Sequence, residues 1–316
     1  MSVCGSIWTG SGGTGPIVSD IPFLGEIAGL LTAVCWSGSS LVFSTATRRL
    51  GTVLVNIARL VFALIFLAIL IPAFGIPLQV SSTQILYFAI SGVIGLALGD
   101  SFLFRAYVHI GPRLSMLVMS IAPAVSAVCA WFILGEYLSL LGIAGIIITV
   151  VGVALVVYEP GSQSRLPGSD LAVGILSAGV AAVSQGVGLT FAKLAFMEGS
   201  VDGFVAAAIR IASSLVVLLP IVLLFRRLPD PVKAFTNDVK GFWLTALGSV
   251  LGPFIGITLS LLAVQHTKVG IAATLIATVP IIMLPMVHFI YREHLTARSI
   301  VGACIAVAGV AVLFLH

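Results

Sequence analysis

Three ionisable residues lie well inside long apolar segments, where a charged side chain is costly. Arg59 occurs in NIARLVF, Arg210 in AAIRIAS and Asp100 in GDSFLFRAY. Such residues in membrane segments normally face the protein interior, where they pair with one another or line a polar route. Arg59 and Arg210 are therefore candidate ligands for an anionic substrate group, and Asp100 is a candidate for binding a substrate or a coupling proton. Two simpler roles stay open: Arg59 can extend to the nearer membrane interface, and Asp100 can form a structural ion pair with Arg59.

Uncharged polar side chains stand midway through two further apolar segments. Trp36, Ser37 and Ser40 lie in the first segment of the chain, and Gln185 lies in a matching segment of the second half. Serine is common where membrane helices pack together, so a packing role remains open for both serines. Tryptophan and glutamine are bulkier and harder to explain as spacers. We predict that all four residues contact the substrate.

Two segments with the same pattern carry the remaining candidates. Residues 121–136 read IAPAVSAVCAWFILGE and residues 278–293 read TVPIIMLPMVHFIYRE, so that Pro123 and Glu136 recur as Pro280 and Glu293. A proline inside a helix removes a backbone hydrogen bond and bends the helix, and the freed carbonyl groups must face protein or a water-filled cavity. Pro123 and Pro280 are predicted to be gating kinks. The two glutamates are candidate proton-coupling groups or, alternatively, acids near the start of the next helix, where the helix dipole favours them.

The composition requires lipid as the surrounding solvent. Of the 316 residues, 59% are apolar and 8% are charged, and the mean hydropathy is +1.22, whereas soluble domains carry about 25% charged residues. The apolar runs lack the alternation of barrel strands, which predicts an all-α polytopic membrane protein. A crossing needs about 20 apolar residues, and the sequence offers ten such runs, at about 24–46, 52–75, 84–106, 112–134, 139–158, 170–196, 201–224, 241–264, 269–291 and 296–315.

The second half of the chain repeats the first. Arg59 matches Arg210 at an offset of 151 residues, whereas Asp100 has Ile257 at its equivalent position at an offset of 157. Glycines recur at the offset of 157: Gly95 and Gly252, Gly99 and Gly256, Gly145 and Gly302, Gly152 and Gly309. The chain is therefore predicted to be a duplication of one unit.

The repeat divides the chain into four parts. Residues 1–23 form a Gly/Ser-rich tail that we expect to be disordered, 24–158 the first five-helix repeat, 159–169 a polar linker and 170–316 the second five-helix repeat. A copy that follows five crossings enters the membrane in the opposite orientation, so the two repeats are predicted to be inverted. Inverted repeats are typical of secondary transporters, whose sites lie between the repeats near the membrane midplane.

Basic residues are distributed unevenly among the predicted connections. Eleven of the fifteen Lys and Arg residues lie in or beside the connections that follow odd-numbered helices, two lie on the opposite side and two lie within helices. Because basic residues collect on the cytoplasmic side, this count predicts that both chain termini face away from the cytoplasm.

The duplicated helices resemble a known family. The helix from Pro123 to Glu136, the glycine-rich helix after it (LLGIAGIIITVVGVALVVYE), their counterparts in the second half and the opening helix with Trp36-Ser37-Gly38 are similar to the EamA repeat of the drug/metabolite transporter superfamily. The resemblance covers about residues 24–316. It implies a ten-helix carrier of amino acids, nucleotide-sugar-like metabolites or drugs. It also implies that both termini are cytoplasmic, which is opposite to the charge count.

These observations predict a secondary active transporter that moves small polar or amphipathic metabolites, such as amino-acid-like compounds or drugs, across the plasma membrane by alternating access. Export follows from the resemblance alone. A passive channel and a membrane-embedded enzyme acting on a lipid-linked substrate are the alternatives, although the chain has no HExxH, GxSxG or glycine-rich nucleotide loop. We expect a small-molecule substrate and the lipid bilayer as partners, leave a homodimer open, and expect no catalytic residue, cofactor, metal or nucleic acid.

Overall fold

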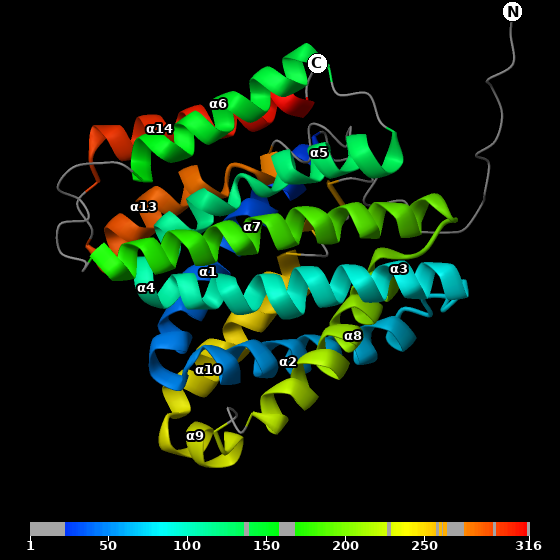
Figure 1. Ribbon diagram of the computed structural model, residues 1–316. Helices are drawn as coiled ribbons and strands as arrows, with labels where there is room; N and C mark the ends of the chain where they lie inside the picture. The colour runs from blue at the N-terminus through cyan, green and yellow to red at the C-terminus, as the bar shows by residue number, and fades with distance from the viewer. Residues whose placement is uncertain are drawn as a thin grey trace, which may run out of the picture.

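The described part of the chain is entirely helical. The computed structural model describes residues 23–135, 139–157, 168–225, 229–256, 259–260, 262–263, 275–292 and 295–314, and no strand occurs among them. The elements of the first half, in chain order, are α1 (Leu24–Leu50), α2 (Thr52–Ala73), α3 (Ser82–Gly92), the π-helix η1 (Val93–Gly99), α4 (Asp100–Met119), α5 (Ala122–Leu134) and α6 (Leu140–Val157). Those of the second half are α7 (Gly168–Met197), α8 (Gly203–Leu224), α9 (Pro231–Asn237), α10 (Val239–Ser249), the π-helix η2 (Val250–Gly256), α13 (Val279–Tyr291) and α14 (Ala297–Phe314) (Figure 1).

The boundaries of these elements repeat as the sequence does. Both ends of α10, η2, α13 and α14 lie 157 positions after the corresponding ends of α3, η1, α5 and α6. Both ends of α8 lie 151 positions after those of α2. The two offsets are the ones found in the sequence, so the duplicated residues occupy equivalent places in equivalent helices.

Seven helical segments are long and apolar enough to cross a membrane. They are Leu24–Leu50, Thr52–Ala73, Ser82–Met119, Leu140–Val157, Gly168–Met197, Gly203–Leu224 and Val239–Gly256. Three apolar helices, Ala122–Ile133, Val279–Tyr291 and Ala297–Leu313, are shorter. The expected ten separate runs are thus found only in part, because α3, η1 and α4 join into one segment and because the predicted run 112–134 is interrupted.

The interruption lies just before Pro123. The prediction that Pro123 and Pro280 bend continuous helices is therefore wrong. Pro123 and Pro280 occupy the first turn of α5 and of α13, where a missing N–H group breaks no intrahelical hydrogen bond. The chain instead tightens immediately before each helix: the Ile121 N–H donates to the Val118 carbonyl and the Thr278 N–H to the Leu275 carbonyl, both at 3.1 Å. The two prolines therefore begin short helices after a break rather than bending a continuous helix.

A second break lies within α4. Gly111 adopts φ 74° and ψ 170°, a conformation that side-chain-bearing residues rarely adopt, and it separates 100–110 from 112–119. The predicted boundary between the runs 84–106 and 112–134 coincides with this glycine. The helix direction therefore changes where the sequence placed a connection.

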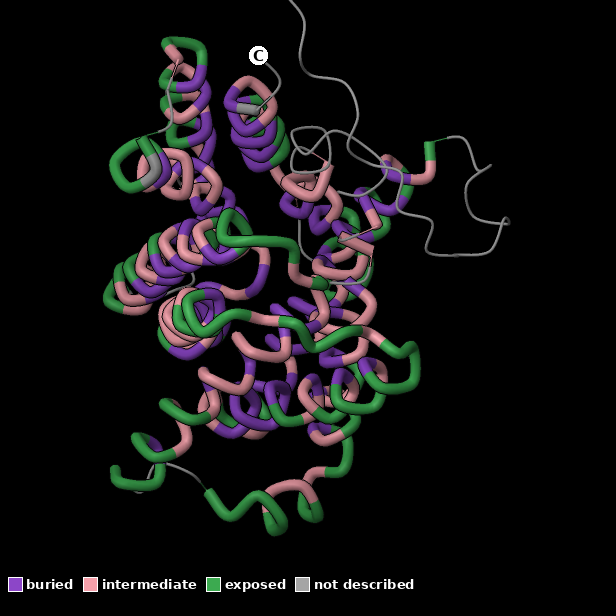
Figure 2. The backbone as a smooth tube through the Cα atoms, turned by 90° about the vertical axis from the view of Figure 1, so that its right-hand side faces the viewer, coloured by how far each residue is buried: buried purple, intermediate pink, exposed green. Residues whose placement is uncertain are grey.

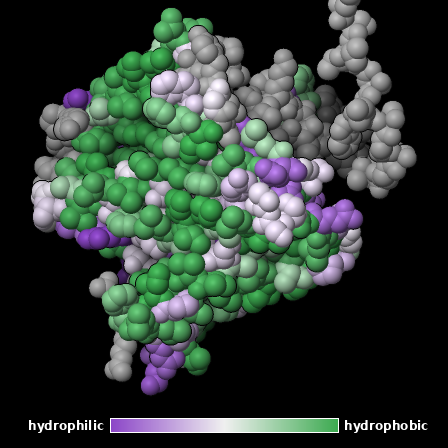
Figure 3. Space-filling view, turned by 45° about the vertical axis from the view of Figure 1, so that its right-hand side comes forward, coloured by the Kyte–Doolittle hydropathy of each residue, from purple (hydrophilic) through white to green (hydrophobic). Residues whose placement is uncertain are grey.

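The exposed surface is apolar, as a lipid environment requires. Buried residues lie on the sides where helices face one another (Figure 2). One face of the molecule is mostly hydrophobic, with hydrophilic residues gathered towards its edges (Figure 3). Large apolar side chains on this surface include Phe132, Leu140, Leu224 and Phe289, each more than 70% exposed.

Helices α6 and α14 cross at glycines and lie side by side at one end of the molecule (Figure 1). A Cβ added to Gly145 would lie 2.7 Å from the Gly309 carbonyl oxygen, and one added to Gly302 would lie 2.9 Å from the Gly152 carbonyl oxygen. Only glycine permits backbones to approach so closely. Gly302 is the counterpart of Gly145, and Gly309 is the counterpart of Gly152, each at an offset of 157. The second contact is therefore the equivalent of the first in the other repeat.

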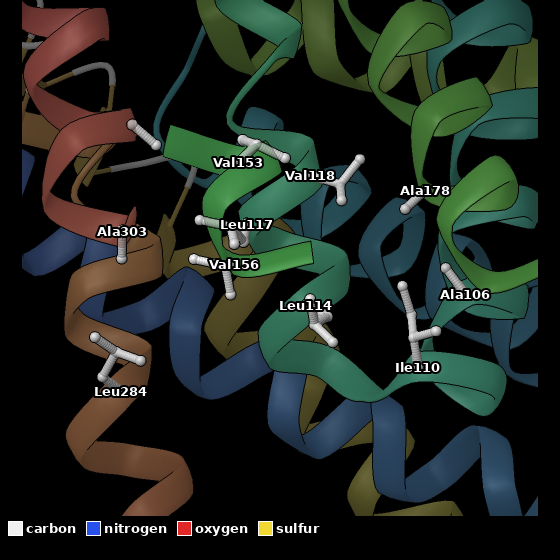
Figure 4. Packing of buried hydrophobic residues seen from close by; sticks show 11 residues of the cluster. Ala106, Ile110, Leu114, Leu117, Val118, Val153, Val156, Ala178, Leu284 and Ala303 are labelled. Carbon is white, nitrogen blue, oxygen red and sulfur yellow. The ribbon is translucent and has the colours of Figure 1, made fainter. Parts of the chain in front are cut away.

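A buried apolar cluster joins the two halves near this crossing. It contains Leu114, Leu117 and Val118 from α4, Val153 and Val156 from α6, and Leu284 and Ala303 from the second half (Figure 4). Each cluster member is at most 7% exposed. The halves therefore share a core and do not form separate domains.

Candidate functional site

Arg59 and Asp100 form a buried ion pair between α2 and α4. The Arg59 Nη2 group donates to Asp100 Oδ2, and the side chains are 10% and 7% exposed. Gln185 of α7 donates from Nε2 to the other carboxylate oxygen, Oδ1, at 2.9 Å. The ion pair that the sequence analysis proposed is thus present, with a second donor from the other half of the chain. Both oxygens of Asp100 are engaged.

The π-helix η1 delivers Asp100 to this place. Asp100 follows η1 directly and is the first residue of α4. A π-helix is rare and is frequently found at functional sites. Gly95 within η1 leaves room for the site, because a Cβ there would lie 3.3 Å from Gln185 Oε1 and 3.4 Å from Arg210 Nη2.

Two polar residues that the sequence analysis did not select extend the network. Arg59 Nε donates to Asn56 Oδ1 at 3.1 Å, and Asn56 Nδ2 donates to Ser101 Oγ at 3.0 Å. Asn56 and Arg59 are three residues apart, which places them on the same face of a helix. That spacing in NIARLVF was the signal that could have identified Asn56.

Aromatic rings cover the Arg59 guanidinium. Its Cζ lies 4.9 Å from the Phe104 ring centroid and 5.8 Å from that of Phe43. A cation over an aromatic ring is stabilised by about 0.5–2 kcal/mol when solvent is excluded. Tyr107 stacks on Phe104 with ring centroids 5.6 Å apart, and its hydroxyl group donates to Met116 Sδ at 3.4 Å. Ser40, one of the predicted substrate contacts, donates from Oγ to the Trp36 carbonyl within α1 at 2.8 Å.

Arg210 faces the same interior as Arg59. The two arginines line a cavity of about 60 Å³ between α2, α8, η1 and η2, together with Leu96, Pro253 and apolar residues of α2 and α8. Arg210 Nε is buried and has no hydrogen-bond partner among the described residues. The described carboxylate whose charge acts on Arg210 is Asp100.

A larger pocket adjoins the network at Asn56. It has a volume of about 370 Å³ and is lined by Val53 and Asn56 of α2, Ser101 of α4, and Leu218, Ile221, Val222 and Phe225 at the end of α8 and just beyond it. Small-molecule sites commonly have volumes of about 300–1,000 Å³ with mostly apolar walls and a few polar groups. This pocket has that character, with Asn56 and Ser101 as its polar groups.

The other predicted contacts lie elsewhere or outside the described residues. Ser37 Oγ donates to the Ala33 carbonyl at 2.7 Å and to the Val279 carbonyl at 3.2 Å, which joins α1 to α13. The Trp36 indole packs beside Gly256 of η2. Neither residue lines the two cavities described above. Glu136 and Glu293 lie outside the described residues.

In the part of the chain that the structure describes, the site holds two guanidinium groups and one carboxylate in an interior with aromatic and aliphatic walls. Among the described residues, no three His, Cys, Asp or Glu side chains lie close enough together to hold a metal ion. An interior of this kind can bind a small polar molecule that carries charge, since buried charged groups in membrane proteins mark substrate and ion pathways.

Comparison with known proteins places the chain in the class of membrane transport proteins. The sequence matches the EamA-like transporter family at residues 23–158 and again at 172–315. The chain belongs to this family and is an integral membrane protein.

Individual relatives are distant. An uncharacterized transporter of Archaeoglobus fulgidus is 23% identical over 219 residues, which are 69% of this chain and 74% of the relative. A protein of known crystal structure superposes with a TM-score of 0.65 over 92% of this chain and 96% of its own, at 20% identity. The structural similarity shows the fold, and the sequence relationships point to a transporter rather than an enzyme.

Proposed function

We propose that this protein is a secondary active transporter that exports a small polar or amphipathic metabolite, such as an amino-acid-like compound or a drug, across the plasma membrane. Transport proceeds by alternating access between two inverted five-helix repeats, with ten membrane crossings in total. The observation that carries this proposal is the reciprocal crossing of α6 and α14.

Reciprocal contacts indicate a two-fold axis. In an interface around such an axis, residue i of one unit contacts residue j of the other, and j contacts i. Gly145 contacts Gly309, and their counterparts Gly302 and Gly152 contact each other. Thr149 Oγ1 donates to the carbonyl oxygen of its own counterpart, Ala306, at 3.4 Å. This pattern supports repeats related by a rotation of about 180°, as inverted halves require.

The candidate site lies at a second reciprocal contact. Helices α2 and α8 are counterparts, and they pack together through Leu60 and Ile211, which are 151 positions apart. Arg59 and Arg210 are separated by the same offset and line one cavity. A site between equivalent elements of two repeats can open to either side as the repeats exchange conformations.

Counterflow into proteoliposomes tests the proposal. Vesicles containing the purified protein are loaded with one unlabelled compound, and uptake of a trace of the same labelled compound is followed, using the proteinogenic amino acids and a lipophilic dye as the panel. A carrier takes up label faster when its substrate is present on the opposite side. We expect saturable, trans-stimulated uptake of at least one compound, and this uptake should be reduced in Arg59→Gln but retained in Arg105→Gln, which removes an exposed arginine of α4.

Two outcomes contradict the proposal. Uptake that neither saturates nor responds to the compound inside indicates a channel. Covalent conversion of a lipid-linked compound by the reconstituted protein, without movement of any solute, indicates an enzyme.

A further inference from the structure

The charges in the site do not balance within the described residues. Arg59 and Arg210 both face the cavity of about 60 Å³, and Asp100 is the carboxylate that acts on both. Asp100 already accepts hydrogen bonds from Arg59 and from Gln185, one on each oxygen. One positive charge therefore remains without a hydrogen-bonded anion.

The geometry identifies which arginine is left over. Arg59 donates to Asp100 and to Asn56, and it lies against Phe104. Arg210 Nε is buried and makes no hydrogen bond with any described residue. A buried N–H group without a hydrogen-bond partner is unfavourable, and such groups are rare in folded proteins. Because Arg210 also lines the cavity of about 60 Å³, its guanidinium group is available to an anion that binds there.

The repeat supplies an independent observation. Arg59 and Arg210 are counterparts, but Asp100 has no acidic counterpart, because Ile257 occupies the equivalent position in the sequence. The first half thus provides an acid for its arginine, and the second half does not. An anion bound at Arg210 would restore the arrangement that Asp100 provides for Arg59.

The cavity limits the size of the group that binds. The cavity of about 60 Å³ is much smaller than the roughly 300–1,000 Å³ of sites for whole small molecules, so it suits a compact group such as a carboxylate. Asn56 lines the larger pocket of about 370 Å³, and Arg59, which is hydrogen-bonded to Asn56, lines the smaller cavity, so we place the apolar remainder of the ligand in the larger pocket. Leu218, in the wall of that pocket, lies about 12 Å along α8 from Arg210, given a rise of about 1.5 Å per residue.

We propose that Arg210 binds the anionic group of the transported substrate, and that the substrate is a small organic anion with an apolar remainder. That the bound anion is transported rests on the proposed function, whereas the binding of an anion at Arg210 does not. Gln185, whose amide oxygen lies beside Gly95 as Arg210 Nη2 does, orients the site from α7.

Binding to the purified full-length protein in detergent tests the assignment without any transport step. The probes are pentanoate, pentanamide and pentylamine, which share a size and differ in charge, and the readout is the thermal unfolding temperature against probe concentration at constant ionic strength. We expect a saturable rise with pentanoate and none with the other two. Because a hydrogen bond to a charged group contributes about 1.5–3 kcal/mol, Arg210→Gln should weaken pentanoate binding by roughly tenfold to a hundredfold. Arg105→Gln is the matched control and should bind as the unchanged protein does.

A second pair of variants keeps the test decisive if Arg210→Gln does not fold. Gly95→Asp places a carboxylate beside Arg210 Nη2, and Gly95→Asn places a neutral group of the same shape there. Gly95→Asp should lose pentanoate binding because it supplies its own anion, whereas Gly95→Asn should retain more of it. Equal binding by these two variants would overturn the assignment.

Other results are equally informative. Similar stabilisation by pentanoate, pentanamide and pentylamine would show that charge is not recognised. Chloride that binds as tightly as pentanoate and displaces it would overturn the assignment to an organic anion. If the protein binds the anion through Arg210 but shows no counterflow, the binding site is supported and the proposed transport function is contradicted.

Discussion

Removing Asp100 should destabilise the protein more than removing Arg59. The carboxylate of Asp100 is 7% exposed, accepts from Arg59 and Gln185, and also acts on Arg210. Asp100→Asn therefore removes the described counter-charge of Arg59, which is buried, and of Arg210, which is partly buried. Arg59→Gln leaves one carboxylate that still has Arg210 nearby. The structure thus predicts unequal effects from the two halves of one ion pair.

The magnitude follows from the cost of an unpaired buried charge. Breaking a buried pair by removing one partner costs roughly 3–5 kcal/mol, and two unit charges about 4 Å apart interact by about 4 kcal/mol at an effective dielectric constant of 20. We expect Asp100→Asn to lower the free energy of unfolding by an amount at the upper end of this range. Arg59→Gln should lower it by an amount at the lower end. The double variant should lose clearly less than the sum of the two.

The assay is a double-mutant cycle on the free energy of unfolding in detergent, followed by tryptophan fluorescence, with counterflow measured on each variant that folds. Independent residues give additive effects within about 0.3–0.5 kcal/mol. Additive single effects, or an Arg59→Gln variant less stable than Asp100→Asn, would refute the reasoning. A stable double variant that transports normally would make the pair structural, whereas a stable double variant without counterflow would place it in the pathway.

Three further predictions concern other parts of the fold. Gly145→Ala should lower the unfolding free energy by about 1–3 kcal/mol, because its Cβ would lie 2.6 Å from a backbone nitrogen of α14. Gly179→Ala is the control, because a Cβ there meets open space. Equal effects of the two substitutions on unfolding in detergent would contradict the close crossing. A reporter fused after His316 should signal from outside the cytoplasm, as the distribution of basic residues predicts; a cytoplasmic signal would show that the family resemblance is the better guide. Hydrogen bonds from Arg49 lower the pKa of Asp238, at the start of α10. The stabilisation by this pair is therefore present above the ordinary carboxyl pKa of about 3.9 and is lost as the pH falls below it. Asp238→Asn should flatten that part of a plot of unfolding temperature against pH, and an unchanged plot would argue against the pair.

Much of the helical framework was accessible from the sequence because duplication and hydropathy are both written in it. The offsets of 151 and 157 recur in the helix boundaries, and the deep placement of Arg59 and Asp100 indicated their pairing. The repeat also marked Gly145 and Gly309 as equivalent to other glycines, although their mutual contact required the structure.

Other features left no readable pattern. A π-helix differs from an α-helix in which carbonyl each N–H group reaches, and hydropathy does not report that choice for Val93–Gly99. The role of Pro123 depended on where the helix begins, because proline bends a helix interior but is well accommodated in a first turn. Asn56 escaped notice because its importance comes from Arg59 and Ser101, which only the folded chain brings to it.

The reciprocal crossing of α6 and α14 has a consequence for how such a protein can change over generations. In a dimer of two identical single-repeat chains, the contacts Gly145–Gly309 and Gly302–Gly152 would be one contact, and any substitution would appear on both sides of the axis at once. An acid at the position of Asp100 would then accompany both arginines. Joining the copies in one polypeptide lets each half accumulate substitutions separately, which is the condition under which one arginine can keep an internal partner while the other is released to meet a ligand.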